Sequence, residues 1–152
     1  MRDLHSEITV VQTIPAKLHQ ESTASVNGTG VDGSRHFAVE HIVNVGISLE
    51  TLSGSLKTTL YLEDSADNST YAAVTDAAYI IGDMVTLASG IFAVIDAAAE
   101  DPAVFNIGYR GPQRYSRVRA LFTGNHSTGT PLGAVAIKGE PRFSGTTGIF
   151  PA

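Results

Sequence analysis

Residues 36–46 read HFAVEHIVNVG, and this stretch indicates most clearly what kind of fold the chain adopts. Its side chains alternate in character, as in a β-strand whose successive residues point to opposite faces of a sheet. One face holds Phe37, Val39, His41, Val43 and Val45, and the other holds Ala38, Glu40, Ile42 and Asn44. The sequence therefore predicts a strand with one face directed toward a core.

Similar segments lie on both sides of this strand. Strands are expected at ITVVQTI (8–14), SLKTTLYLED (55–64), YAAV (71–74), 84–88, 91–95, VFNIGYR (104–110), RYSRVRALFTG (114–124) and PLGAVAIKG (131–139). Residues 75–81 are expected to form a loop or a helical turn. About eight short strands separated by turns, with almost no helix, predict an all-β protein, a β-sandwich of the jelly-roll type.

The length of 152 residues suits one domain. We expect an N-terminal arm over 1–20, a sandwich domain over 21–143 and an extended C-terminal tail over 144–152, because the two ends lack a continuous apolar face. Residues 19–35 are polar and rich in glycine, with NG and DG turn dipeptides. We interpret them as a long hairpin or loop.

Composition narrows the classes of function. The net charge is −5, with only ten Lys and Arg, which argues against general binding to nucleic acid. The absence of cysteine excludes disulfides and cysteine-based metal sites. The N-terminus does not resemble a secretory signal, and no apolar run is long enough to predict a membrane helix.

Four of the basic residues lie in YRGPQRYSRVR (109–119). In a strand over 114–124, Tyr115, Arg117 and Arg119 share one face, opposite a row of apolar side chains. One interpretation is a solvated strand face whose arginines pair with carboxylates on neighbouring strands. The other is a protein interface, where Arg and Tyr are enriched. We predict that Tyr115, Arg117 and Arg119 lie at or beside a subunit contact.

No arrangement of residues predicts an enzyme. The five histidines show no metal-binding spacing, and neither a nucleophile-elbow nor a phosphate-loop motif is present. We therefore expect no catalytic residues, no metal and no cofactor. His41 lies on the apolar face of its strand, and we expect a hydrogen-bonded core or interface histidine.

Several motifs occur in a recognisable order. The chain begins MRDLHSEI, continues with LYLEDSADNSTYAAV (60–74) and IGYRGPQRYSRVRALFTG (107–124), and carries GAVAIKGEPR (133–142) near its end. This order resembles a family of small proteins encoded in the head-gene region of tailed phages and prophages. The resemblance covers about 1–12 and 36–143.

The resemblance implies a virion structural protein, specifically a capsid decoration (cement) protein on the outer surface of the head. Its partners would be the major capsid protein and further copies of itself, in a homotrimer. Tyr109, Gly111, Arg114 and Tyr115 match the tyrosine, glycine, arginine and tyrosine of the family's third motif. We expect Gly111 to set a turn and Arg114 to bind a nearby carbonyl or carboxylate group.

Two alternatives remain open. One is a structural role elsewhere in the virion, in the tail or the head–tail connector. The other is a carbohydrate-binding β-sandwich on the virion surface, which would need exposed aromatic side chains. That alternative is weak, because the chain has six Phe, five Tyr and no Trp.

Overall fold

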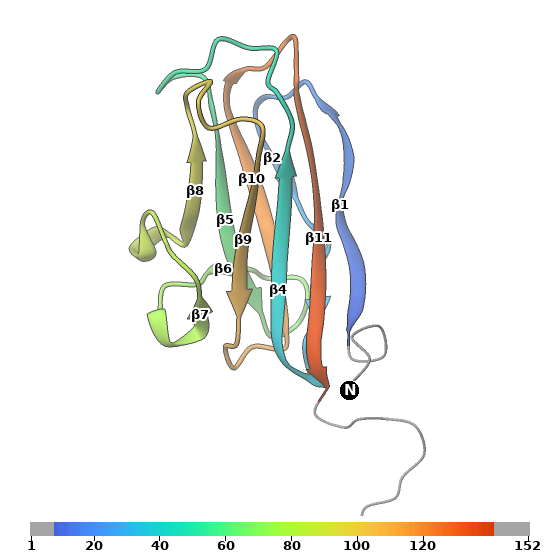
Figure 1. Ribbon diagram of the computed structural model, residues 1–152. Helices are drawn as coiled ribbons and strands as arrows, with labels where there is room; N and C mark the ends of the chain where they lie inside the picture. Colours follow the sequence, from blue (N-terminus) through green and yellow to red (C-terminus); the bar gives the residue numbers. More distant parts are fainter. Residues whose placement is uncertain (1–7, 142–152) are drawn as a thin grey trace, which may run out of the picture.

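The structure, a computed structural model, describes residues 8–141. Two antiparallel sheets pack face to face (Figure 1), which confirms the predicted all-β sandwich. Eight strands are five residues or longer, and three more have two residues each. Within the described residues, no helix is long and apolar enough to cross a membrane.

The first sheet has five strands. In spatial order they are β1 (Thr9–His19), β11 (Thr130–Pro141), β4 (His36–Val45), β9 (Ala103–Tyr109) and β7 (Ile80–Ile81). β4 pairs with β11 on one side and with β9 on the other. The strand that identifies the fold in the sequence therefore lies in the middle of its sheet.

The second sheet contains six strands. The order β2 (Ser22–Asn27), β10 (Tyr115–Asn125), β5 (Lys57–Ser65) and β6 (Ala72–Ala73) is extended by β3 (Val31–Asp32), which pairs with β10, and β8 (Ile91–Ile95), which pairs with β5. β10 and β5 are paired over nine positions, from Tyr115 opposite Ser65 to Thr123 opposite Lys57. Arg117 and Arg119 lie on this long central pair of strands.

The pairings of the long strands are nested along the chain. β1 pairs with β11, β2 with β10, β4 with β9 and β5 with β8, and all four pairs are antiparallel. The chain thus resembles one long hairpin that has been rolled up.

The core lies between the two sheets and follows the strand alternation. Val39, His41, Val43 and Val45 of β4 are buried, as predicted, whereas Phe37 near the start of the strand is exposed. Phe122 is the largest fully buried side chain, and its ring lies between those of His19 and His126. The core thus includes histidines together with aliphatic side chains.

The N-terminal arm predicted over 1–20 is wrong for Thr9–His19, which form β1 and pair with β11. Pro15 has no N–H group to donate, a property that commonly interrupts a strand. Instead, the register shifts between Gln12 and Lys17 and leaves Pro15 outside the ladder of this edge strand. Residues 1–7 and the predicted tail over 144–152 lie outside the described part of the chain.

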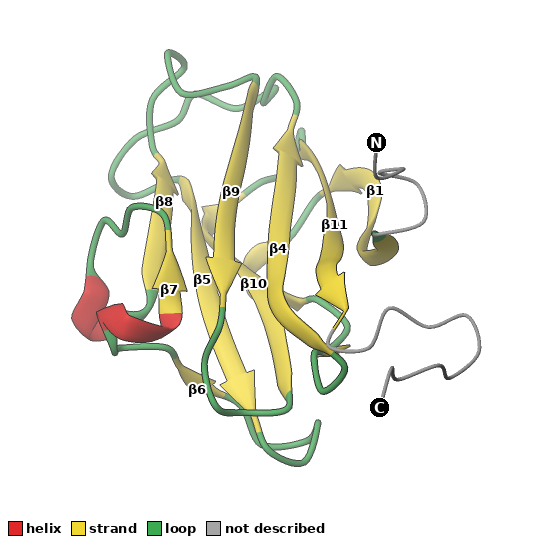
Figure 2. Ribbon diagram, turned by 60° about the horizontal axis from the view of Figure 1, so that its bottom comes forward, coloured by secondary structure: helices red, strands yellow, loops and turns green. Residues whose placement is uncertain are grey.

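Two further expectations are corrected. The segment 19–35, interpreted as a long hairpin or loop, contains β2 and β3, which both pair with β10 rather than with each other. The strand predicted over 84–88 does not form. Gly82 and Gly90 adopt positive φ angles of 118° and 69°, and a 3₁₀ turn occupies Leu87–Ser89 (Figure 2). The other 3₁₀ turn, Ala77–Tyr79, agrees with the helical turn predicted over 75–81.

Candidate functional site: the outer faces of the two sheets

The arginines of β10 lie on the outer face of the second sheet. Val118 and Ala120 of the same strand are fully buried on the inner face, so Arg117 and Arg119 point away from the core. The register places Arg117 opposite Glu63 of β5 and Arg119 opposite Tyr61. The predicted common face of Tyr115, Arg117 and Arg119 is therefore confirmed.

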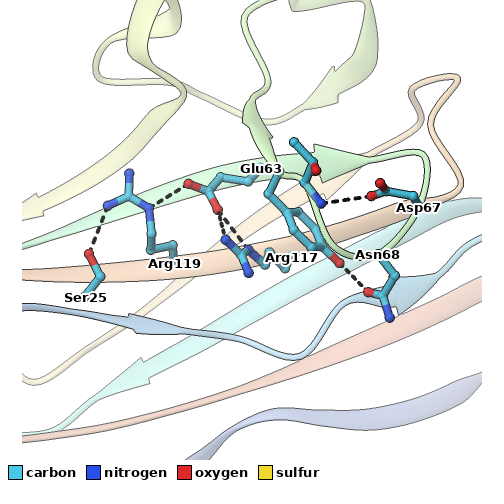
Figure 3. A network of polar contacts seen from close by, with 8 residues as sticks. Ser25, Glu63, Asp67, Asn68, Arg117 and Arg119 are labelled. Atoms are coloured by element: carbon cyan, nitrogen blue, oxygen red, sulfur yellow. Dashed lines mark hydrogen bonds and ion pairs between the residues drawn. The ribbon is translucent and has the colours of Figure 1, made fainter.

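Glu63 lies between the two guanidinium groups (Figure 3). Its Oε2 accepts hydrogen bonds from Nε of Arg117 at 2.8 Å and lies 2.8 Å from Nη2, while its Oε1 accepts one from Nε of Arg119 at 2.6 Å. The side chains of Glu63, Arg117 and Arg119 are only 10%, 18% and 22% exposed. The charges are therefore largely removed from water, and removing one of them would leave the others poorly solvated.

Two tyrosines hold the guanidinium groups from the side. The ring of Tyr71 lies 3.8 Å from Cζ of Arg117, and the ring of Tyr61 lies 3.9 Å from Cζ of Arg119. Stacking of this kind is favourable and fixes the plane of the guanidinium group. We call Tyr61, Glu63, Tyr71, Arg117 and Arg119 the arginine cluster.

The turn after β5 fixes Tyr71 in place. Oδ1 of Asp67 accepts hydrogen bonds from the backbone N–H groups of Ser69 and Thr70, and these bonds hold the pKa of Asp67 well below its usual range. The Tyr71 hydroxyl donates to Oδ1 of Asn68 (Figure 3). The DNST motif thus forms a turn that delivers an aromatic ring to the arginine cluster.

The turn between β9 and β10 contains the other residues singled out in the sequence. The hydroxyl of Tyr109 donates to Oδ2 of Asp64 at 2.7 Å, and burial raises the pKa of both groups. Gly111 lies against the ring of Tyr109, so close that a Cβ atom would overlap it. A side chain at position 111 would therefore have to displace the Tyr109 ring from its place beside Asp64.

Arg114 behaves differently from its neighbours on β10. It binds Oδ2 of Asp32 through Nε and Nη2, at 3.1 and 2.7 Å, which confirms the expected contact with a carboxylate. This ion pair lowers the pKa of Asp32 and raises that of Arg114. The pair is 55% and 37% exposed, so it contributes little to stability compared with the arginine cluster.

A groove crosses the outer face of the first sheet. Its lining includes the polar residues Gln12, Lys17 and Asn44, and we define its apolar part, called the apolar groove, by Ala16, Ile42, Val104, Pro131 and Val135. Val104 is 63% exposed, and Ile42 and Val135 are directly paired between β4 and β11.

The shape of the groove depends on the irregular part of β1. Ala16 of β1 lies against Gly133 of β11. A Cβ atom at position 133 would be only 2.7 Å from the methyl group of Ala16. The bulge around Pro15 thus brings the edge strand over the sheet and forms one wall of the groove. Together with the exposed valine, it leaves an apolar surface of the kind that protein contacts use.

His41 connects the two sheets through the core. Its side chain is fully buried, and Nε2 lies 2.9 Å from Oγ of Ser116 on β10. Burial lowers the pKa of His41 to about 4. The expected hydrogen-bonded core histidine is confirmed, and residues 8–141 bring together no group of three acidic or histidine side chains that could hold a metal ion.

Part of this surface could not be identified from sequence. The arginines pair with Glu63 of their own chain, as in the interpretation of cross-strand pairing, and a subunit contact through them stays a prediction. Tyr61 and Tyr71 were not recognised as their stacking partners. The apolar groove was not predicted either. Ile42, a large apolar side chain between the outward-facing Glu40 and Asn44, was a signal for it.

The comparisons with known proteins identify no family. No protein-family model matches the chain, and a search of curated proteins finds no sequence with significant similarity.

Proposed function

We propose that the protein is a structural component of a phage particle, a decoration protein that binds and stabilises the assembled head shell. The observation that carries this proposal is that both outer faces of the sandwich present surfaces suited to protein contact. One is the apolar groove around Val104, and the other is the arginine cluster. The order of the sequence motifs supports the same role.

The composition of the two surfaces favours contact with protein. Covering an apolar surface with an exposed valine is favourable, because each Å² removed from water stabilises the contact by about 25 cal/mol. Tyr and Arg are the residues that most often dominate the energetics of protein interfaces. A subunit with contact surfaces on both faces can bind a shell on one side and its own copies on the other.

The proposed homotrimer follows from the symmetry of shells. A decoration protein that occupies a threefold position binds three equivalent sites at once, and closed rings of identical contacts satisfy this requirement. Binding to the assembled shell, but not to its separated subunits, would stabilise the particle by mass action. The nested strand pairing supports a jelly-roll sandwich as the scaffold for these contacts.

The carbohydrate-binding alternative receives less support. Sugar rings stack on open aromatic faces, whereas Tyr61 and Tyr71 each have one face covered by a guanidinium group. A role in the tail or connector would use the same kinds of contact surface, so it must be separated by experiment.

The experiment is to produce particles with and without an intact gene for this protein, and to separate heads from tails. Quantitative mass spectrometry should find the protein in the head fraction in many copies per particle. Heads that lack it should lose their DNA at lower temperature or lower ionic strength. Recovery in the tail fraction, or absence from both fractions, would contradict the proposal.

A further inference from the structure

The arginine cluster has more positive than negative charge. It holds two guanidinium groups and one carboxylate, that of Glu63. The nearby acids have other partners: Asp32 pairs with Arg114, Asp64 accepts from Tyr109, and Asp67 accepts from the backbone of its own turn. One positive charge of the cluster therefore has no counterpart on the described part of the chain.

The hydrogen-bond donors of the cluster are also only partly used. A guanidinium group has five N–H donors. Arg117 directs Nε and Nη2 toward Glu63, and Arg119 uses Nε toward Glu63 and Nη1 toward Oγ of Ser25. Within residues 8–141, Nη1 of Arg117 and Nη2 of Arg119 have no protein acceptor. Neither atom is fully buried, so both are accessible to solvent.

The unused donors lie on groups that are already held in position. Stacking on Tyr71 and Tyr61 fixes the planes of the two guanidinium groups, and Glu63 fixes their rotation. A ligand that bound there would therefore cost little side-chain entropy, because the arginines are ordered before it arrives. Tyr and Arg are also enriched among the residues that dominate binding at protein interfaces.

We propose that the arginine cluster is a docking site for one carboxylate group, an Asp or Glu side chain on an acidic segment of the partner protein. A carboxylate accepts charge-assisted hydrogen bonds from guanidinium N–H groups, and its single charge would balance the cluster. The inference relies on the proposed function in one respect, because the acidic segment is assigned to the capsid protein.

The charge of the chain favours a single carboxylate over a polyanion. The protein as a whole carries −5, and the excess at the cluster is one unit. A nucleic-acid strand would bring many charges and would need a wide basic field, which this face does not provide. A second copy of this chain is the other possible source of a carboxylate, and the test separates the two.

The test is an NMR titration of the isolated protein at low salt, observing the Nε–Hε signals of its arginines. The probes are the blocked peptide acetyl-GEGEG-amide and its neutral counterpart acetyl-GQGQG-amide. We expect saturable shifts at Arg117 and Arg119 with the glutamate peptide only, at about millimolar concentration. Arg114, which already has its own carboxylate, provides the internal control, and its shift should stay small and linear.

The matched variants are Arg119→Lys and Arg114→Lys. Each keeps its positive charge but loses the planar fork. Arg119→Lys should weaken binding of the glutamate peptide at least tenfold, and Arg114→Lys should leave it within twofold. The titration of the natural protein decides the question even if Arg119→Lys fails to fold.

Three results would overturn the proposal. They are equal shifts at Arg114 and at the cluster, equal binding of the two peptides, or shifts that depend on protein concentration without any peptide, which would identify a second copy as the occupant. Because the titration needs no particles, its failure would leave the proposed function to be judged by the head fractions. Saturable binding by a protein that is absent from heads would instead refute only the proposed function.

Discussion

The two outer faces of the sandwich differ in chemistry. Charged and aromatic side chains form the arginine cluster on the second sheet, and apolar side chains form the groove on the first. On the second sheet, the arginine cluster is tied into its own chain by Glu63 and two tyrosines, so its side chains contribute to the stability of the fold. On the first sheet, Val104 and its neighbours in the apolar groove point into solvent and contribute little to the isolated domain. Substitutions in the groove should therefore have little effect on the fold, whereas substitutions in the cluster should disturb it.

Substitutions on the two faces should therefore have different effects. A change in the cluster should alter both the free energy of unfolding and binding, while a change in the groove should alter binding alone.

The largest effect should come from Glu63→Gln, which removes the only carboxylate of the cluster. Two arginines that are less than a quarter exposed would then lack an anion. The free energy of unfolding should fall by about 2–4 kcal/mol, because uncompensated charges would stay in a poorly solvated place. Urea denaturation measures it, with Asp32→Asn as the control for an exposed pair and an expected loss under about 1 kcal/mol. Equal losses in the two variants would mean that the two ion pairs do not differ in kind.

His41 lies in the core, and its titration tests a contribution to stability that depends on neither outer face. Its pKa is about 4 in the folded protein, below the ordinary value of 6.5. Between these values the unfolded chain binds a proton that the folded protein does not, so stability falls as the pH is lowered through this window. From pH 8 to pH 5 the loss due to His41 should be about 2 kcal/mol.

The check on His41 is the pH dependence of urea denaturation in the natural protein and in His41→Gln. Glutamine keeps a hydrogen-bonding group near Ser116 but does not titrate in this range. The variant should lose about 2 kcal/mol less than the natural protein between pH 8 and pH 5. Parallel curves for the two proteins would show that the folded protein protonates His41 without cost.

Substitution of a single arginine should have an intermediate effect on stability, and Arg117 and Arg114 should differ in this effect. Arg117→Ala leaves Glu63 paired with Arg119 but exposes the ring of Tyr71, and we expect a loss of about 1–2 kcal/mol. Arg114→Ala removes an exposed pair, and the loss should be under about 1 kcal/mol. Thermal denaturation of the two variants side by side is sufficient, and a larger effect from Arg114→Ala would contradict the assignment.

The smallest effect on stability should come from the apolar groove. Val104→Asp places a charge where the side chain is 63% exposed, so the free energy of unfolding should change by no more than about 0.5 kcal/mol. Binding to particles should nevertheless fall strongly, because the charge would have to be desolvated in the contact. Val85→Asp is the matched control, since Val85 is 61% exposed but lies in a loop away from the groove. Equal binding by the two variants would show that the groove is not a contact surface.

Much of the fold could be predicted from sequence because local alternation is strong in the central strands. Val39, Val43 and Val45 on one face of 36–46 are sufficient to identify a buried strand. The strand predicted over 8–14 matches the first part of β1, whereas the rest of β1 and all of β2 were not predicted, because both strands form sheet edges and have weak apolar patterns. Pro15 also suggests an end to the strand when considered alone, and only the register with β11 shows that the strand continues beyond it.

The candidate site was predictable only in part, for a related physical reason. Alternation alone places Tyr115, Arg117 and Arg119 on one face, because it is a property of a single strand. Their partners lie on other strands, and the choice of Glu63 rather than Asp64 depends on which face of β5 each one occupies. Asp64 points inward to Tyr109, whereas Glu63 points outward to the arginines.

The proposed binding of this sandwich to a phage head shell can be checked by a reconstruction of particles that carry the protein, at a resolution that shows side chains. We expect the sandwich on the outside of the shell, with the apolar groove covered and a carboxylate of the capsid protein within hydrogen-bonding distance of Arg117 or Arg119. Heads without density for the sandwich, or a bound sandwich whose two outer faces both remain in solvent, would contradict it.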